Sequence, residues 1–217
     1  MAIYTPQQQQ PKKIYIRVPK LPSEYQEVEY IESSWTQYID TTYTPNLNIK
    51  IACKFAHNEH SSDTPVFWAR NPWAWSVSHQ NGYVLWSHPS EYWSNDTLVI
   101  FASKEQYVTR YTEWTEIEFE YDKSNWKYWN QTWTWNCTNN YSNVNMVMFG
   151  LREGTSIDSR KFKWKMFYFK VWDDWILVRD FVPCYRKSDS VAGMYDLVNN
   201  TFYTNGWTWD FTVWPNA

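Results

Sequence analysis

The sequence predicts an all-β fold, and three observations support that prediction. From Leu21 onward, almost every periodic stretch alternates between apolar and polar residues with period 2, as a half-buried strand does. No window shows convincing helical periodicity. Clusters of Asn, Asp, Ser and Pro separate the stretches, which is typical of a sandwich or barrel of short strands. A chain of this size favours a two-sheet antiparallel jelly-roll sandwich.

The first 20 residues are predicted to be a separate arm, followed by the sandwich domain over residues 21–217. The arm reads "MAIYTPQQQQPKKIYIRVPK". Pro and β-branched residues favour extended backbone, so we expect an anchor that lies along a partner; a flexible tail is the alternative. The arm has no apolar h-region and is therefore not expected to be a Sec signal peptide.

Two strands can be assigned with their faces. The stretch "EIEFEYD" (116–122) places Ile117, Phe119 and Tyr121 on one face and its carboxylates on the other. The stretch "KFKWKMFYFKVW" (161–172) starts with lysines on one side and becomes apolar on both. It therefore predicts a strand that runs from a solvated margin into a covered centre. A turn of two or three residues follows, and then the strand "ILVRDFVP" (176–183).

Tryptophan occupies positions where turn chemistry calls for glycine. The chain has 17 Trp and only 5 Gly, although Gly averages about 7% of residues. Asn125-Trp126 and Asp174-Trp175 lie where Asn-Gly or Asp-Gly would complete a hairpin. Trp172, in contrast, sits within an expected strand. The turn-like or bulge-like positions are Trp35, Trp114, Trp126, Trp175, Trp207 and Trp209.

Both ends of the domain resemble a known family. Residues 21–46 ("LPSEYQEVEYIESSWTQYIDTTYTPN") and 177–211 ("LVRDFVPCYRKSDSVAGMYDLVNNTFYTNGWTWDF") resemble the opening and closing stretches of concanavalin A-like (laminin-G-like) jelly-roll modules. Such modules are common in phage structural proteins and gut-bacterial surface proteins. "FWARN" (67–71) and "DSRKFKWK" (158–165) also match. The resemblance covers about residues 21–213 and is loose over 72–135. It implies Gly at Trp35, Trp68, Trp164, Trp207 and Trp209.

We therefore expect that many of these Trp residues are Gly in the natural polypeptide. UGA specifies Trp in some genetic codes and Gly in others, so translation with the wrong table would make this exchange. A non-Gly residue in the left-handed region costs about 1–2 kcal/mol. Several such sites together would approach a domain's whole stability of about 5–15 kcal/mol. The alternative is that the indoles are genuine and pack in the core or stack on sugars.

Composition argues against several function classes. The formal net charge of −3, with no clustered basic face, argues against nucleic-acid binding. No apolar run approaches the roughly 18 residues of a membrane helix. Three widely spaced cysteines (Cys53, Cys137 and Cys184) form neither a disulfide framework nor a metal knuckle, which favours synthesis in a reducing cytoplasm. We expect no cofactor and no metal.

Carboxylates and histidines are the candidates for chemistry. Glu27 and Glu29, and the glutamates of 116–122, have the two-residue spacing that some jelly-roll glucanases use. Their regular alternation favours a solvated outer face instead. In "HNEH" (57–60) the spacing is not that of a zinc-protease helix. A metal site with Cys53 is conceivable, but we expect an exposed loop. The other histidines are His79 and His88.

A glycan-contact region is predicted within the segment 79–95, "HQNGYVLWSHPSEYWSN". Tyr83, His88 and Tyr92 lie there among polar residues, and a tyrosine offers an apolar ring together with a hydroxyl. The alternative is an ordinary loop with incidental aromatics.

The resemblance implies a non-enzymatic virion component, a phage head-fibre or tail-associated module. The arm would dock on other virion proteins or on sister subunits, the oligomer would be a trimer by analogy, and the domain could contact host-surface glycans. A virion protein leaves the host by lysis, which agrees with the expected lack of a signal peptide. The alternatives are a carbohydrate-binding module of a bacterial surface or secreted protein, and a jelly-roll glycoside hydrolase.

Overall fold

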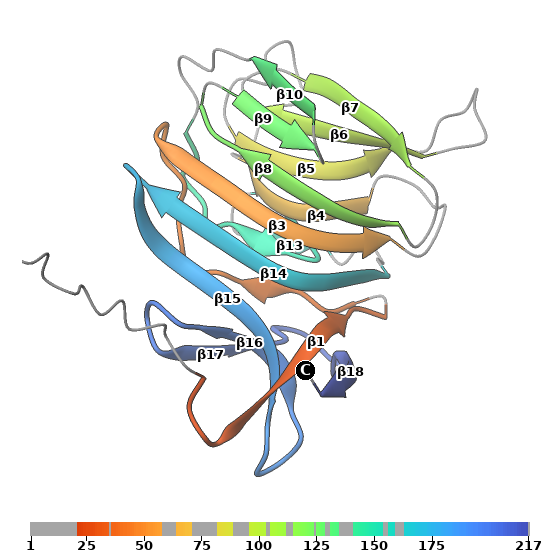
Figure 1. Ribbon diagram of the computed structural model, residues 1–217, viewed down its shortest axis with the longest axis vertical. Coiled ribbons are helices and arrows are strands. Elements are labelled where there is room, and N and C mark those ends of the chain that lie inside the picture. Colours follow the sequence, from red (N-terminus) through yellow and green to blue (C-terminus); the bar gives the residue numbers. More distant parts are fainter. Residues whose placement is uncertain are drawn as a thin grey trace, which may run out of the picture.

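The computed structural model describes most of the domain as two layers of strands (Figure 1). The described residues are 21–34, 36–57, 64–70, 82–88, 96–102, 105–111, 115–123, 125–128, 131–134, 141–153, 156–158 and 163–216. Within them there is no helix, and every strand pairing is antiparallel except that of β12 with β4. The predicted all-β, β-sandwich type of fold is therefore confirmed. The predicted arm, residues 1–20, lies outside the described residues.

The larger sheet, sheet A, contains ten of the described strands. In spatial order they are β10 (Gln131–Thr134), β9 (Asn125–Tyr128), β8 (Glu116–Tyr121), β3 (Ile49–His57), β14 (Trp164–Asp173), β1 (Tyr25–Glu32), β15 (Ile176–Arg186), β16 (Ala192–Asp196) and β17 (Thr201–Thr204), with β18 (Thr212–Asn216) paired to β1. Several neighbours in the sheet are distant in sequence, as in β8-β3-β14. The middle of the sheet therefore gathers residues from three separate parts of the chain.

The smaller sheet, sheet B, contains eight of the described strands. Their order is β13 (Ser156–Asp158), β12 (Leu151–Glu153), β4 (Thr64–Arg70), β5 (Gly82–His88), β6 (Asp96–Ala102) and β7 (Glu105–Tyr111), with β11 (Val147–Met148) paired to both β2 (Ile39–Asp40) and β4. Sheet B lies behind β8, β3 and β14 in Figure 1.

The core fills the space between the two sheets. Phe67 of β4 packs against Phe169 of β14, with the ring centroids 5.6 Å apart, and also faces Phe119 of β8 at 6.5 Å. Tyr83 of β5 meets Tyr121 of β8 edge-on at 5.8 Å. These rings come from opposite sheets, and aromatic pairs at such distances stabilise a core beyond the area they bury.

The predicted faces of β8 are confirmed. Ile117, Phe119 and Tyr121 are buried, while Glu116 and Glu118 are exposed on the opposite face. The long strand predicted up to residue 172 is also present as β14, and Trp172 lies in it as expected. A bulge between Met166 and Tyr168 shifts its register, so Phe167 and Tyr168 are both half-buried.

Two tryptophans adopt the backbone conformation that favours glycine. Asp174 and Trp175 form the two-residue turn between β14 and β15 with φ values of 44° and 69°, and Trp209 has φ 76°. Positive φ at both central residues is the signature of the type I′ hairpin turn, which prefers Asp-Gly. The indoles of Trp175 and Trp209 are 76% and 77% exposed, so packing gives little in return for the strained backbone. The glycine-type turn backbone predicted at these two positions is therefore present.

The same prediction is wrong for Trp126. The hairpin between β8 and β9 turns before Asn125, where the Asn125 N–H donates to the Asp122 carboxylate at 2.7 Å and Asp122 N–H donates to the Asn125 carbonyl at 2.7 Å. Trp126 therefore lies within the return strand β9, opposite Tyr121. Asp122 closes this turn, so no glycine is required.

The other tryptophans at which Gly was predicted lie in different settings. Trp68 and Trp164 are strand residues that are 7% and 0% exposed, so the structure gives no backbone reason for Gly at either position. Trp207 is exposed but lacks a positive φ. Trp35 and Trp114 lie outside the described residues.

Replacing Trp175 or Trp209 with Gly is expected to stabilise the protein by about 1 kcal/mol at each site. Relief of the left-handed strain gives about 1–2 kcal/mol, and the added chain entropy of Gly offsets part of it. Urea unfolding of the single variants measures the effect. Trp175→Ala and Trp209→Ala are the matched controls, because they also remove the indole but keep the β-carbon. Equal stability of the Gly and Ala variants would contradict the backbone explanation.

Candidate functional site

The glycan contacts were predicted at Tyr83, His88 and Tyr92. Among these three side chains, the structure describes only that of Tyr83. Tyr83 is 1% exposed, and its hydroxyl donates to the Asn46 carbonyl at 2.6 Å. Residues 82–88 form strand β5 rather than a loop. Tyr83 is therefore a core residue and not a surface contact for a glycan. The side chain of His88 and the whole of Tyr92 lie outside the described residues.

The expectation of an exposed loop at His57 is wrong. His57 ends β3, is 1% exposed and packs its ring against the indole of Trp164, with centroids 4.2 Å apart. The described residues contain no group of three or more His, Cys, Asp or Glu side chains that could hold a metal ion. Cys53 and Cys184 are free and buried. Burial raises the pKa of both thiols, that of Cys184 to about 12, so neither is an activated nucleophile.

The outer face of sheet A carries a ladder of ion pairs across β3, β8 and β9. Lys54 Nζ lies 2.6 Å from Glu116 Oε2, and Lys50 Nζ lies 3.1 Å from Glu120 Oε1. Lys127 of β9 approaches the same Glu120 oxygen at 3.4 Å. Such pairs on a solvated face contribute at most about 1 kcal/mol each. Their main consequence is that positive and negative groups stand close together, with little net charge.

Aromatic rings accompany this ladder. Lys50 lies over the ring of Trp172 at 5.1 Å, and Lys54 lies over the ring of Phe167 at 4.6 Å. All four groups come from the adjacent strands β3 and β14. The outer face of sheet A therefore combines apolar ring surface with ammonium and carboxylate groups.

A hollow lies in the middle of this face, above Ala52. We call it the central hollow; it has a volume of about 140 Å³ and is lined by Ala52, Glu118, Phe119, Glu120, Lys127 and Tyr168. The small side chain of Ala52 leaves room between the longer residues around it. Glu118 also lines the hollow, from the exposed face of β8.

Tyr168 is a hydrogen-bond donor on the wall of the central hollow. Burial, together with the negative charges of Glu118 and Glu120, raises the pKa of Tyr168 to about 12. Its hydroxyl therefore stays protonated at neutral pH, and its half-buried ring offers an apolar face beside the carboxylates.

This shift predicts an alkaline loss of stability. The folded protein holds the phenol proton of Tyr168 more tightly than the unfolded chain, in which the pKa of tyrosine is about 10. The protonated phenol therefore makes its full contribution to stability below a pH of about 10. The contribution is lost as the pH rises from about 10 toward 12. Denaturant unfolding at stepped pH is expected to show a smaller decline for Tyr168→Phe than for the parent chain. Identical declines would contradict a raised pKa at Tyr168.

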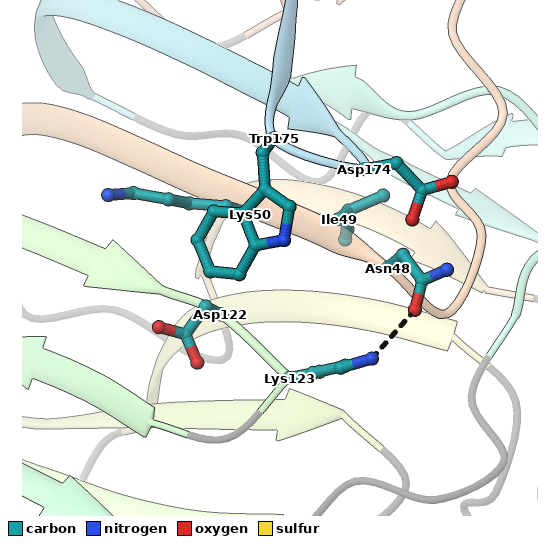
Figure 2. A pocket seen from close by; sticks show the side chains of 7 residues that line it. All are labelled: Asn48, Ile49, Lys50, Asp122, Lys123, Asp174 and Trp175. Atoms are coloured by element: carbon teal, nitrogen blue, oxygen red, sulfur yellow. Dashed lines mark hydrogen bonds between the residues drawn. The ribbon is translucent and has the colours of Figure 1, made fainter.

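A second hollow lies where the turns at one end of sheet A meet (Figure 2). We call it the end hollow; it has a volume of about 30 Å³ and is lined by Asn48, Ile49, Lys50, Asp122, Lys123, Asp174 and Trp175. Lys123 Nζ donates to Asn48 Oδ1 at 3.0 Å. Asn48 is itself oriented by the local chain, since its N–H donates to Asn46 Oδ1 at 2.8 Å.

The carboxylates of β8 are arranged differently from a glycosidase pair. A glycosidase needs two carboxyl groups facing each other across the bond, one of them held protonated in an apolar site. Here Glu116 and Glu120 form ion pairs with Lys54 and Lys50 on the outer face of the sheet. The regular alternation of β8 also places its glutamates side by side on one strand, as the sequence predicted.

Sequence reasoning missed Ala52, Lys127 and Tyr168. These residues belong to β3, β9 and β14 and meet only because the strands pair in this order. The one available signal was Ala52, a small outward residue between Lys50 and Lys54 in "IKIACKF".

Among the described residues, no helix has the length and apolar character that a membrane span requires. A scan against protein-family models and a search of curated proteins both gave no match.

Proposed function

We propose that the protein is a non-enzymatic structural component of a phage virion, a head-fibre or tail-associated protein that uses a lectin-like domain to contact host-surface glycans. The observation behind the binding role is the central hollow, where Tyr168 stands beside Glu118, Glu120 and Lys127. Its domain would be the concanavalin A-like jelly roll that the sequence resembles, and the sandwich type of fold is compatible with this.

The chemistry of the central hollow fits a neutral polyhydroxyl ligand. Carboxylates accept hydrogen bonds from sugar hydroxyls, whereas an ammonium and a phenol donate to them. The ring of Tyr168 supplies an apolar surface for the C–H face of a sugar. Opposite charges are closely matched around the hollow, with Glu120 shared by Lys50 and Lys127. This matching gives little net attraction for a strongly charged ligand.

The virion role rests on the resemblance of both ends of the domain. In this proposal the arm, residues 1–20, docks on other virion proteins or on sister subunits, and the domain forms a homo-oligomer, a trimer by analogy with phage fibres. The protein would be made in the host cytoplasm and carried on the particle. A carbohydrate-binding module of a bacterial surface or secreted protein is the alternative, and it would use the same hollow.

We also propose that Gly is the natural residue at positions 175 and 209, as misreading of UGA codons would explain. The support is the positive φ of Trp175 and Trp209 together with the exposure of both indoles. The central hollow does not depend on either residue.

Binding of the full chain to purified surface polysaccharides from candidate host bacteria tests the glycan role. At least one polysaccharide is expected to bind, and Tyr168→Ala is expected to weaken binding about tenfold or more, since the variant loses a ring contact and a hydrogen bond worth about 1.4 kcal/mol or more together. Trp207→Ala is the matched control, because it removes an aromatic ring that is 54% exposed and lines neither hollow. No binding to any polysaccharide, or equal binding by Tyr168→Ala, would overturn the proposal.

A further inference from the structure

The central hollow and the end hollow adjoin on the same face of sheet A. Glu120 lines the central hollow, and Lys50 lines the end hollow. The two residues form an ion pair at 3.1 Å, so a single ion pair separates the two spaces. Lys50 and Ala52 are alternate residues of β3 and therefore point to the same side of the sheet.

We infer that the two hollows are consecutive parts of one track for a linear oligosaccharide, and that the side chain at position 175 covers the second part. This inference rests on the proposed glycan binding and specifies the ligand class. The track follows β8 from Glu118 through Glu120 and continues to Asp122, the residue after the strand. The four steps from Glu118 to Asp122 span about 13 Å in extended backbone, a length that suits a chain of sugars rather than a single ring.

The polar groups of the end hollow can continue the contacts made in the central hollow. Lys123 uses one ammonium proton on Asn48, which leaves two for a ligand. Asp174 is exposed at the rim and can accept hydrogen bonds. The lysine and the carboxylate come from the β8–β9 and β14–β15 turns, which close over the same end of β3 (Figure 2).

The indole of Trp175 restricts the end hollow. Figure 2 shows the ring projecting from the β14–β15 turn across the space between Lys50 and Asp122. The end hollow has a volume of about 30 Å³, against about 140 Å³ for the central hollow, and the indole takes up part of the space that a sugar ring would need there. Glycine at this position, which the φ of 69° favours, removes the cover and leaves only the Lys50–Glu120 ion pair between the two hollows.

Isothermal titration calorimetry of the full chain tests the track. The probes are size-fractionated oligosaccharides released by partial acid hydrolysis of a surface polysaccharide that binds the protein. Trp175→Gly is expected to bind the longer fragments about tenfold more tightly. The one or two hydrogen bonds gained in the end hollow account for an increase in affinity of that size. Affinity for the shortest fragment that binds is expected to stay the same.

Trp209→Gly is the matched control. It makes the same exchange at a similar φ and exposure, so it reproduces any effect of greater stability, but it lies on a different loop and should not change binding. Trp175→Phe keeps a ring at the site and should behave as the parent does.

The outcomes separate the track from the proposed function. Binding by the parent chain with no gain for longer fragments in Trp175→Gly, or with the same gain in Trp209→Gly, overturns the track and leaves glycan binding intact. Absence of binding by every variant, including to the polysaccharide itself, overturns both.

Discussion

Replacing Asp196 with Ala is expected to destabilise the protein by about 3–5 kcal/mol. Asp196 is fully buried at the end of β16. Its Oδ1 accepts from the N–H groups of Asp180 and Val198, both at 3.0 Å, and its Oδ2 accepts from the Asn199 side chain at 2.6 Å. Arg179 Nε lies 3.6 Å from the same Oδ2. Removing the carboxylate leaves two N–H groups without their acceptor and a largely buried guanidinium without its counter-charge.

Asp196→Asn separates the two contributions. It keeps an acceptor oxygen for the Asp180 and Val198 N–H groups while removing the charge that faces Arg179, so it should lose clearly less than Asp196→Ala. Chemical denaturation with a shared m-value gives the comparison. A loss below about 1 kcal/mol for Asp196→Ala, typical of a surface site, would mean that this network does not hold the β15–β16 hairpin together.

Trp164→Gly is expected to cost at least about 3–5 kcal/mol. Trp164 is fully buried in β14, where its ring meets Phe55 edge-on with centroids 5.3 Å apart and stacks near His57. Truncation of a buried Trp leaves a cavity with a cost of this size, and Gly in a strand adds further loss. The variant is informative because the family resemblance implies Gly at this position, whereas the packing implies Trp.

Trp164→Phe is the control for this position. The indole Nε1 of Trp164 has no hydrogen-bond partner among the described residues, and an unpaired buried donor is itself costly. Phe keeps most of the ring and removes that donor, so the variant should lie within about 1.5 kcal/mol of the parent chain. Thermal unfolding of both variants checks the pair. A Trp164→Gly protein as stable as the parent would refute the core packing at β14 and favour Gly there.

Local patterns predicted the strands well because each strand contributes its own alternation. The glutamates and apolar residues of 116–122 separate onto two faces as predicted, and the turn at Asp174-Trp175 has the backbone that its sequence position implied. Trp126 was misplaced because Asp122 caps the β8–β9 turn by itself and moves the reversal upstream. A side-chain cap of this kind is difficult to distinguish from an Asn-Gly-type turn when only the residue types are known.

The site was not predictable to the same degree, because it depends on which strands become neighbours. Tyr83 and His57 lie at the ends of polar-looking stretches, yet the opposite sheet and Trp164 bury them. The central hollow needs a small residue on β3 between longer side chains of β8, β9 and β14. Periodicity assigns a residue to a face of its strand but does not specify which strand lies alongside.

Peptide mass spectrometry of the natural protein, isolated from its own source rather than from a recoded gene, tests most directly whether backbone stereochemistry identifies glycine in this chain. Peptides that contain positions 175 and 209 are expected to carry Gly at both, where φ is 69° and 76°. The peptide that contains position 164 is expected to carry Trp, since its ring is fully buried. Trp at both 175 and 209 would contradict the proposal.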